Sequence, residues 1–149
     1  MSDELVQVRV RGLLPAPGGS GVFLEAEGKA ITLFIDPMVT RAFQLFLEDE
    51  EGPRPLTHDL LFSICQAGGL TLQQVVIHDC VAEVYHARIH FQQENELGKS
   101  FLEVDSRPSD AMVMALKFGA PVFVVRRIWE AAEDMKWAVD ELQEPSSDS

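Results

Sequence analysis

The sequence is poor in the residues that mark several large classes of protein. Its 149 residues include only two cysteines, Cys65 and Cys80, which are too few for a disulfide framework or a zinc site. No apolar run approaches the ~18 residues of a membrane-spanning helix. The acidic start, Met-Ser-Asp-Glu, lacks the basic and apolar regions of a signal peptide. These absences predict a cytoplasmic protein with no membrane partner.

Basic residues are scarce as well. The chain has 12 Lys and Arg residues against 24 Asp and Glu residues, so its formal net charge is −12. This balance argues against a protein that coats nucleic acid through a broad basic surface. The acidic residues are concentrated in the run Glu48–Glu51 and in residues 130–149, and the rest of the chain is nearly neutral. That remainder can still carry a local basic site.

Three familiar catalytic signatures are also missing. The sequence has no Gly-rich phosphate loop, no Gly-x-Ser-x-Gly turn and no His-Glu-x-x-His motif. What it does have is 46% hydrophobic and 24% charged residues, close to the averages of globular proteins. Together with the length, this composition predicts one folded domain.

The order of the expected elements predicts an α+β fold. Val6, Val8 and Val10 alternate with polar residues, which is typical of a half-buried strand. Strands are expected at 5–11, 22–27, 30–35, 75–79, 84–91, 101–105 and 121–125, and helices from Pro37, Thr57 and Pro108 and over 128–142. We therefore expect a single domain with a mixed sheet, helices packed on it and a C-terminal amphipathic helix.

The apolar spacing also predicts which side chains are buried. The first helix is expected to bury Met38, Ala42, Phe43 and Phe46, and the second to bury Leu60, Leu61, Ile64 and Cys65. Strands 101–104 and 121–125 lack polar alternation and are expected in the interior of the sheet, with 92–99 as a polar connection. Trp129 and Trp137 on the last helix predict leftover apolar surface, and hence a homodimer or higher homo-oligomer.

The most unusual feature is a near-repetition at two expected helix starts. Arg54-Pro-Leu-Thr-His-Asp59 opens one helix, and Arg107-Pro-Ser-Asp110, preceded by Asp105, opens another. A purely structural interpretation is available, because Thr57 and Ser109 suit helix N-caps and an Asp in the first turn favours the helix dipole.

The same residues suit phosphodiester chemistry. A helix N-terminus offers free N–H groups to a phosphate, and Arg54 and Arg107 can donate to the same anion. Asp59, Asp105 and Asp110 are oxygen ligands of the kind that hold Mg²⁺ or Mn²⁺, and His58 can move a proton. We therefore expect catalytic roles for His58, Asp59, Asp105 and Asp110, substrate binding by Arg54, Thr57, Arg107 and Ser109, and a metal site at Asp59, Asp105 and Asp110.

Both motifs resemble those of the bifunctional nuclease domain family. The resemblance rests on Arg-Pro-Leu-Thr-His-Asp-Leu at 54–60 and on Val-Asp-Ser-Arg-Pro-Ser-Asp-Ala at 104–111, and it covers roughly residues 5–127. It implies a nuclease-like domain over 1–127. The apolar spacing adds a C-terminal helix over 128–143, and the composition of residues 144–149 predicts a disordered tail. The resemblance also implies a nuclease that cleaves DNA or RNA, assisted by a divalent metal ion.

The sequence departs from this family pattern at the start of the first helix. A Gly and a Glu expected there are absent; Asp36 supplies a carboxylate nearby, and Val39-Thr40 follow. A second hypothesis therefore stays open, in which the chain is a non-catalytic oligomeric binding or regulatory module for a protein or an anionic ligand. The acidic composition favours this alternative, whereas the resemblance favours the nuclease.

Overall fold

Seven strands form one mixed sheet in the order β3-β2-β1-β7-β4-β5-β6 in the computed structural model, which describes residues 4–142. The strands are β1 (Leu5–Ala16), β2 (Gly19–Ala26), β3 (Lys29–Ile35), β4 (Leu70–Val81), β5 (Val84–Asn95), β6 (Gly98–Ser106) and β7 (Val122–Val125). Neighbouring strands are antiparallel except β4 and β7, which are parallel. Five helices complete the fold: α1 (Pro37–Leu47), α2 (Thr57–Ala67), α3 (Pro108–Phe118), α4 (Arg126–Ala131) and α5 (Lys136–Leu142). The expected α+β class is confirmed.

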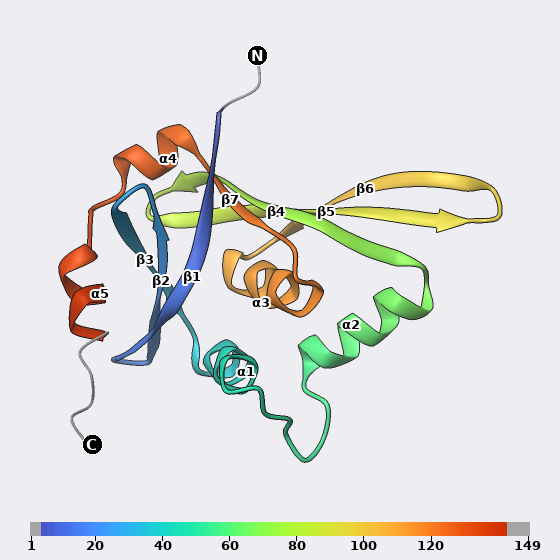
Figure 1. Cartoon of the computed structure of the whole chain (residues 1–149), viewed down its shortest axis with the longest axis horizontal. Coiled ribbons are helices and arrows are strands. Elements are labelled where there is room, and N and C mark those ends of the chain that lie inside the picture. The colour runs from blue at the N-terminus through green and yellow to red at the C-terminus, as the bar shows by residue number, and fades with distance from the viewer. Residues whose placement is uncertain (1–3, 143–149) are drawn as a thin grey trace.

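Strand β1 joins the two halves of the sheet. Its first part, Leu5–Val8, pairs with β7, and its second part, from Arg9 to Ala16, pairs with β2. The register shifts between Val10 and Gly12, and an irregularity of this kind bends a strand and increases its twist. Figure 1 shows the result: β1, β2 and β3 run across the direction of β4, β5 and β6.

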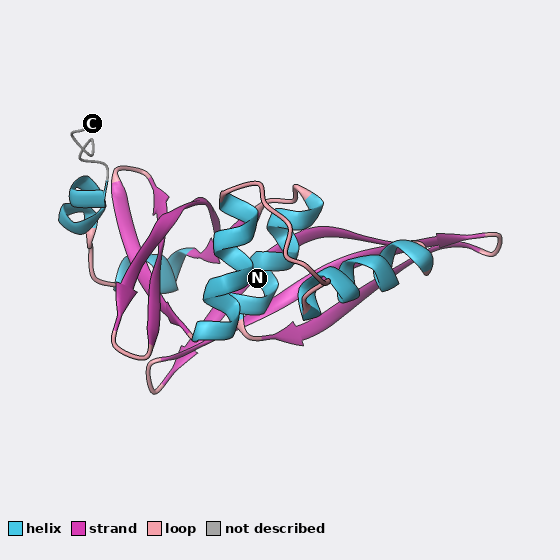
Figure 2. Cartoon of the chain, turned by 90° about the horizontal axis from the view of Figure 1, so that it is seen from below, coloured by secondary structure: helices cyan, strands magenta, loops and turns pink. Residues whose placement is uncertain are grey.

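Helices α1, α2 and α3 lie together on one side of the β4–β6 half (Figures 1 and 2). Helix α3 is the innermost, with nearly all residues from Pro108 to Ala115 buried. The small side chains of Ala111 and Ala115 allow its backbone to approach the sheet closely. The helix ends at Gly119, whose φ of 67° is the left-handed conformation that glycine adopts at low energy.

The burial expected for α1 and α2 is only partly correct. Ala42, Phe43 and Cys65 are buried, but Met38, Phe46, Leu60, Leu61 and Ile64 are exposed. Helix α2 instead turns His58 and Phe62 inward, and the Phe62 ring packs edge-on against Phe118 at 4.7 Å. The α2 sequence is apolar on more than one side, so its spacing alone does not determine which stripe packs.

The interior position expected for strand 101–104 is wrong. The polar connection expected over 92–99 is also different: residues 92–95 continue β5, and a turn at 96–97 leads into β6. The β5–β6 hairpin projects beyond α2, and β6 is the last strand of the sheet, so all its residues except Ser106 are exposed (Figure 1). Strand β7, by contrast, lies between β1 and β4 in the interior, as its apolar sequence predicts.

The continuous C-terminal helix over 128–142 is also wrong, because the structure has two short helices, α4 and α5. The segment between them is tied to the edge of β3: Asp134 accepts hydrogen bonds from the backbone N–H of Ala30 and Lys136, and the Met135 N–H donates to the Ala30 carbonyl at 2.7 Å. Trp129 is buried in the core, whereas Trp137 is 61% exposed. The tail expected over 144–149 lies outside the described residues.

None of the helices in residues 4–142 is long and apolar enough to cross a membrane.

The two tryptophans provide a matched test of the packing. Trp129→Ala is expected to lower the free energy of unfolding by about 3–5 kcal/mol, because a large buried side chain leaves a cavity. Trp137→Ala is expected to change it by less than about 0.5 kcal/mol, because the ring is largely in solvent. Urea denaturation of both variants measures the difference, and similar losses would contradict this account of the C-terminal segment.

Candidate functional site

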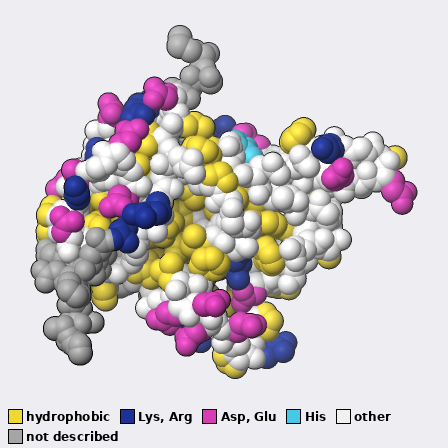
Figure 3. Space-filling view, viewed as in Figure 1, with side chains coloured by type: hydrophobic (Ala, Val, Ile, Leu, Met, Phe, Trp, Pro, Cys, Tyr) yellow, Lys and Arg dark blue, Asp and Glu magenta, His cyan; other side chains and the backbone are white. Residues whose placement is uncertain are grey.

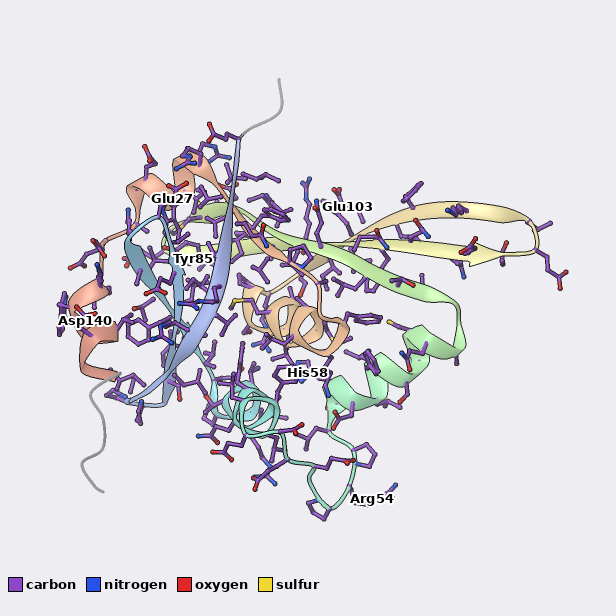
Figure 4. The ribbon with its side chains drawn as sticks, viewed as in Figure 1. Glu27, Arg54, His58, Tyr85, Glu103 and Asp140 are labelled. Carbon is purple, nitrogen blue, oxygen red and sulfur yellow. The ribbon has the colours of Figure 1, made fainter. Side chains whose placement is uncertain are left out.

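The N-termini of α1, α2 and α3 meet at one point, and each contributes a charged or titratable side chain. Asp36 is the N-cap of α1, His58 lies in the first turn of α2, and Arg107 is the N-cap of α3, with Asp110 three residues later. Figure 4 shows His58 between α2 and α3, directed toward the body of the molecule. Segments more than 70 residues apart in the sequence are thus joined by their side chains.

Four side chains form a continuous hydrogen-bonded chain. His58 Nε2 lies 2.9 Å from Asp110 Oδ1, and Arg107 Nε donates to Asp110 Oδ2 at 2.8 Å. Arg107 Nη1 donates to Asp36 Oδ2 at 2.9 Å, while the Val39 N–H donates to Asp36 Oδ1 at 3.0 Å. An ionised carboxylate only accepts hydrogen bonds, so the proton of neutral His58 is placed on Nε2 and Nδ1 keeps its lone pair.

These contacts set the charges of the cluster. Burial acts to raise the pKa of Asp110, but hydrogen bonds from Arg107 and His58 outweigh it, so the pKa lies below the usual value. The Val39 N–H and then Arg107 lower the pKa of Asp36. The two carboxylates in turn raise the pKa of Arg107. Near neutral pH the cluster therefore holds one cation between two anions, beside an imidazole.

The cluster lies at one end of a groove of about 620 Å³. The rest of the lining is largely apolar and comes from α1, α2 and β4–β6, including Leu61, Leu102 and Val104. His58 is buried, but the Arg107 side chain is 60% exposed. The guanidinium is therefore the member of the cluster most accessible to a ligand.

The structure brings together only some of the residues expected at the site. His58, Arg107 and Asp110 are joined, and Thr57 and Asp105 line the groove without hydrogen-bonding to the cluster within the described part of the chain. Ser109 is buried beside Arg107 but lines a different pocket. Neither Thr57 nor Ser109 is an N-cap, because the cap positions fall at Leu56 and Arg107.

Arg54 and Asp59 take other positions. Arg54 lies in the α1–α2 linker, at the tip of a loop that points away from His58 (Figure 4). Both oxygens of Asp59 are engaged: Oδ2 accepts the Leu56 N–H at 2.8 Å, and Oδ1 pairs with Lys117 at the C-terminal end of α3. Asp59 thus ties the start of α2 to the end of α3.

The three carboxylates expected to hold a metal ion are not gathered into one group. Asp59 faces Lys117, and Asp110 is bound by Arg107 and His58. Within residues 4–142, no group of three or more His, Cys, Asp or Glu side chains has the arrangement to hold a metal ion. These residues therefore do not fit a three-carboxylate metal site held by the protein alone.

Asp36 is the member of the cluster that sequence reasoning did not place in the site. The sequence predicts Asp36 as a cap before Pro37 and places its carboxylate near the position where the family pattern has a Glu. Its ion pair with Arg107 spans 71 residues, so no local pattern reveals it. One sequence signal could have placed Asp36 in the site: it is an acidic residue in a region of the family motif, directly before the helix expected from Pro37.

Comparison with known proteins identifies the family of the chain. A family model described as "Bifunctional nuclease domain" matches residues 22–136, which include the whole cluster. The chain belongs to the bifunctional nuclease domain family.

Two curated proteins similar to this chain come from Mycobacterium tuberculosis: "Uncharacterized protein MT1877" of strain CDC 1551 / Oshkosh and "Uncharacterized protein Rv1829" of strain H37Rv. Each is 33% identical over 122 residues, which cover 79% of this chain and 70% of the relative. Their names state no activity, so membership of the bifunctional nuclease domain family supports a nuclease-related function without identifying the reaction.

The lowered pKa values give a prediction for acid stability. Asp36 and Asp110 have folded-state pKa values below their unfolded values, so their contribution is complete above about pH 4 and is lost as pH falls through the folded-state pKa. We expect the free energy of unfolding to fall more steeply with acidification in the parent than in Asp110→Asn. Urea titrations between about pH 6 and about pH 2 measure both slopes. Parallel curves would show that Asp110 is not held ionised by the fold.

Proposed function

We propose that the chain is a nuclease that hydrolyses phosphodiester bonds in DNA or RNA at the His58–Asp110–Arg107–Asp36 cluster. The observation that supports this most is the direct bonding of His58 and Arg107 to the same carboxylate, Asp110, beside an open groove. The carboxylate of Asp110 positions a proton carrier, His58, next to a phosphate-binding group, Arg107. Phosphoryl hydrolysis requires these two groups close together.

Arg107 is the phosphate-binding residue in this proposal. A guanidinium has five N–H groups, and the two bonds to Asp36 and Asp110 use one on Nε and one on Nη1. Within the described residues Nη2 donates to no protein acceptor, and the side chain is largely exposed. The remaining N–H groups suit two oxygens of one phosphate, and the helix N-termini beside them favour an anion.

His58 is the proton carrier. Asp110 holds the Nε2–H, which leaves the Nδ1 lone pair to take a proton from water as the water oxygen adds to phosphorus. The bond from phosphorus to the leaving oxygen breaks, and that oxygen receives a proton from solvent or from the imidazolium. Asp110 acts through His58 and Arg107, and is therefore a positioning residue.

A divalent ion and self-association are further parts of the proposal. Mg²⁺ or Mn²⁺ held jointly by substrate phosphate and one carboxylate would neutralise charge on the phosphate, and its requirement is a prediction that EDTA tests. The homodimer or higher homo-oligomer expected from the sequence is likewise proposed.

A second function, a non-catalytic binding or regulatory module, is favoured by a specific observation. Arg107 is already paired with two carboxylates, and most of the groove lining is apolar. Such a groove also suits an apolar ligand or peptide with a small polar group at one end.

The decisive variant for the enzyme is Asp110→Asn. We expect it to reduce cleavage by about 100-fold or more, because the tautomer of His58 and the orientation of Arg107 are both lost. The free energy of unfolding is expected to fall by only about 1–3 kcal/mol, the usual range for a hydrogen bond between charged groups. Cleavage of single- and double-stranded DNA and of RNA is measured with and without EDTA, together with thermal melting.

Asp134→Asn is the matched control. Asp134 also has a lowered pKa and accepts two backbone hydrogen bonds, but it lies in the α4–α5 linker and outside the groove lining. The Asp134→Asn variant should cleave nucleic acid at the parental rate. An Asp110→Asn protein that melts normally and cuts like the parent would remove Asp110 from the site. A parent that cuts no nucleic acid with or without added metal would favour the binding module.

A further inference from the structure

The outer edge of β6 is the longest unpaired strand edge on the β4–β6 half of the sheet. Strand β6 spans nine residues, Gly98–Ser106, and pairs with β5 on one side only. Among residues 4–142 no element pairs with its other side, and the hairpin that carries it projects beyond α2 (Figure 1). Long exposed edges of this kind offer free N–H and C=O groups to another strand.

The β6 sequence is self-complementary about its central residue. Counting outward from Leu102, Lys99 and Asp105 each stand three positions away, on opposite sides. Neither side chain has a hydrogen bond or ion pair within the described part of the chain. Glu103, by contrast, is already engaged by Arg88 at 3.4 Å and by His90 at 2.8 Å. In the β5–β6 register Lys99 stands opposite Glu94 and Asp105 stands opposite Arg88, but among the described residues neither forms a direct ion pair. The strand therefore carries one cation and one anion at symmetric positions without a direct ion pair.

We infer that two copies of this chain join edge to edge through antiparallel β6 strands, related by a two-fold axis at Leu102. In this register Leu102 faces the partner's Leu102, and Lys99 pairs with the partner's Asp105 at both ends of the interface. The inference rests on the self-association proposed above, and not on the nuclease activity. It gives Asp105 a role at an interface instead of in catalysis.

The negative charge of the chain limits where two copies can meet. Two copies with a net charge of −12 each repel one another wherever acidic side chains meet. In Figure 3 acidic side chains gather over the α1–α2 linker, over α4 and at the end of the projecting β5–β6 hairpin, whereas the middle of this face is largely apolar or uncharged. Helix α2 packs against α3 and β4, and its Leu61 lines the same groove as Leu102 of β6. Asp59 is its one Asp, Glu, Lys or Arg residue, and it is paired with Lys117.

The pairing would also complete the groove. A two-fold axis normal to the sheet keeps the α2 side of both copies on the same side of the joined sheet. Leu102 and Val104 line the groove on that side, so those of the partner continue the lining across the axis. The two clusters would then be connected by one apolar surface made by both copies. Phe101, which is 75% exposed, would lie beside the partner's Glu103 on the opposite face.

A charge-swap experiment tests the register. Light scattering and sedimentation between about 1 μM and about 100 μM give the dimer dissociation constant of the full chain without nucleic acid. We expect Lys99→Glu and Asp105→Lys each to weaken dimerisation by about tenfold or more, because each creates two like-charge contacts. The double variant should recover parental affinity. High salt should weaken the parent dimer and narrow these differences.

Three outcomes would overturn the inference. A monomeric parent across this range removes the interface, and single variants that dimerise like the parent remove the proposed register. A double variant as weak as either single variant shows that the two residues do not meet. Trp137→Ser serves as the control, because the exposed Trp137 is one of the residues from which the sequence predicts self-association; a loss of dimer in that variant alone assigns the interface to α5. Melting curves confirm that each variant is folded, and the masses are independent of any cleavage result.

Discussion

The ion pairs of Arg107 with Asp36 and Asp110 are the contact on which the arrangement of helices α1 and α3 depends. They join two helix N-termini, and the bond from Asp110 to His58 adds the N-terminus of α2. Two carboxylates this close would repel each other without the guanidinium between them. The free N–H groups of the helix ends favour the same negative charge. The fold therefore keeps an ionic cluster at the surface of its most buried helix, α3, where an apolar contact could not satisfy those helix ends.

The same contact defines what the site can bind. A phosphate that approaches Arg107 meets a cation already balanced by two anions, so it must use the donors that the carboxylates leave free. Under the proposed function, a strongly acidic protein carries an anion site because that site depends on the geometry of one guanidinium and not on a positive surface. The largest acidic run of the described chain, Glu48–Glu51, lies in the α1–α2 linker, away from the groove lining.

Much of the fold could be predicted because its signals are local. The valine alternation of β1, the Asp36 cap and the Gly119 stop each follow from the chemistry of a few neighbouring residues, and each is present in the structure. The burial of α2 and the position of β6 could not be predicted in the same way. A strand such as 101–104 has the same sequence pattern at the centre of a sheet and at an exposed edge, because only the strand order distinguishes the two positions.

The site was predictable in part for the same reason. The second Arg-Pro motif indicated Arg107 and Asp110 and the first indicated His58, and the structure joins these three side chains by hydrogen bonds. Their roles in binding and catalysis stay predictions. The near-repetition also suggested Arg54 as the equivalent of Arg107, but the linker before α2 carries Arg54 away from the cluster. Asp36 takes the place beside Arg107 through a contact across 71 residues, which no sequence spacing encodes.

The central claim is that the Arg107 guanidinium receives a phosphate while it holds two carboxylates. Equilibrium binding of an uncleavable phosphorothioate oligonucleotide to the parent and to Arg107→Lys tests this most directly, because it requires neither metal nor turnover. A lysine keeps the charge but has only three donors on one atom, so it cannot bridge Asp36, Asp110 and a phosphate together. The account predicts that Arg107→Lys binds the oligonucleotide at least about tenfold more weakly while remaining folded. Equal affinity of the two proteins would contradict it.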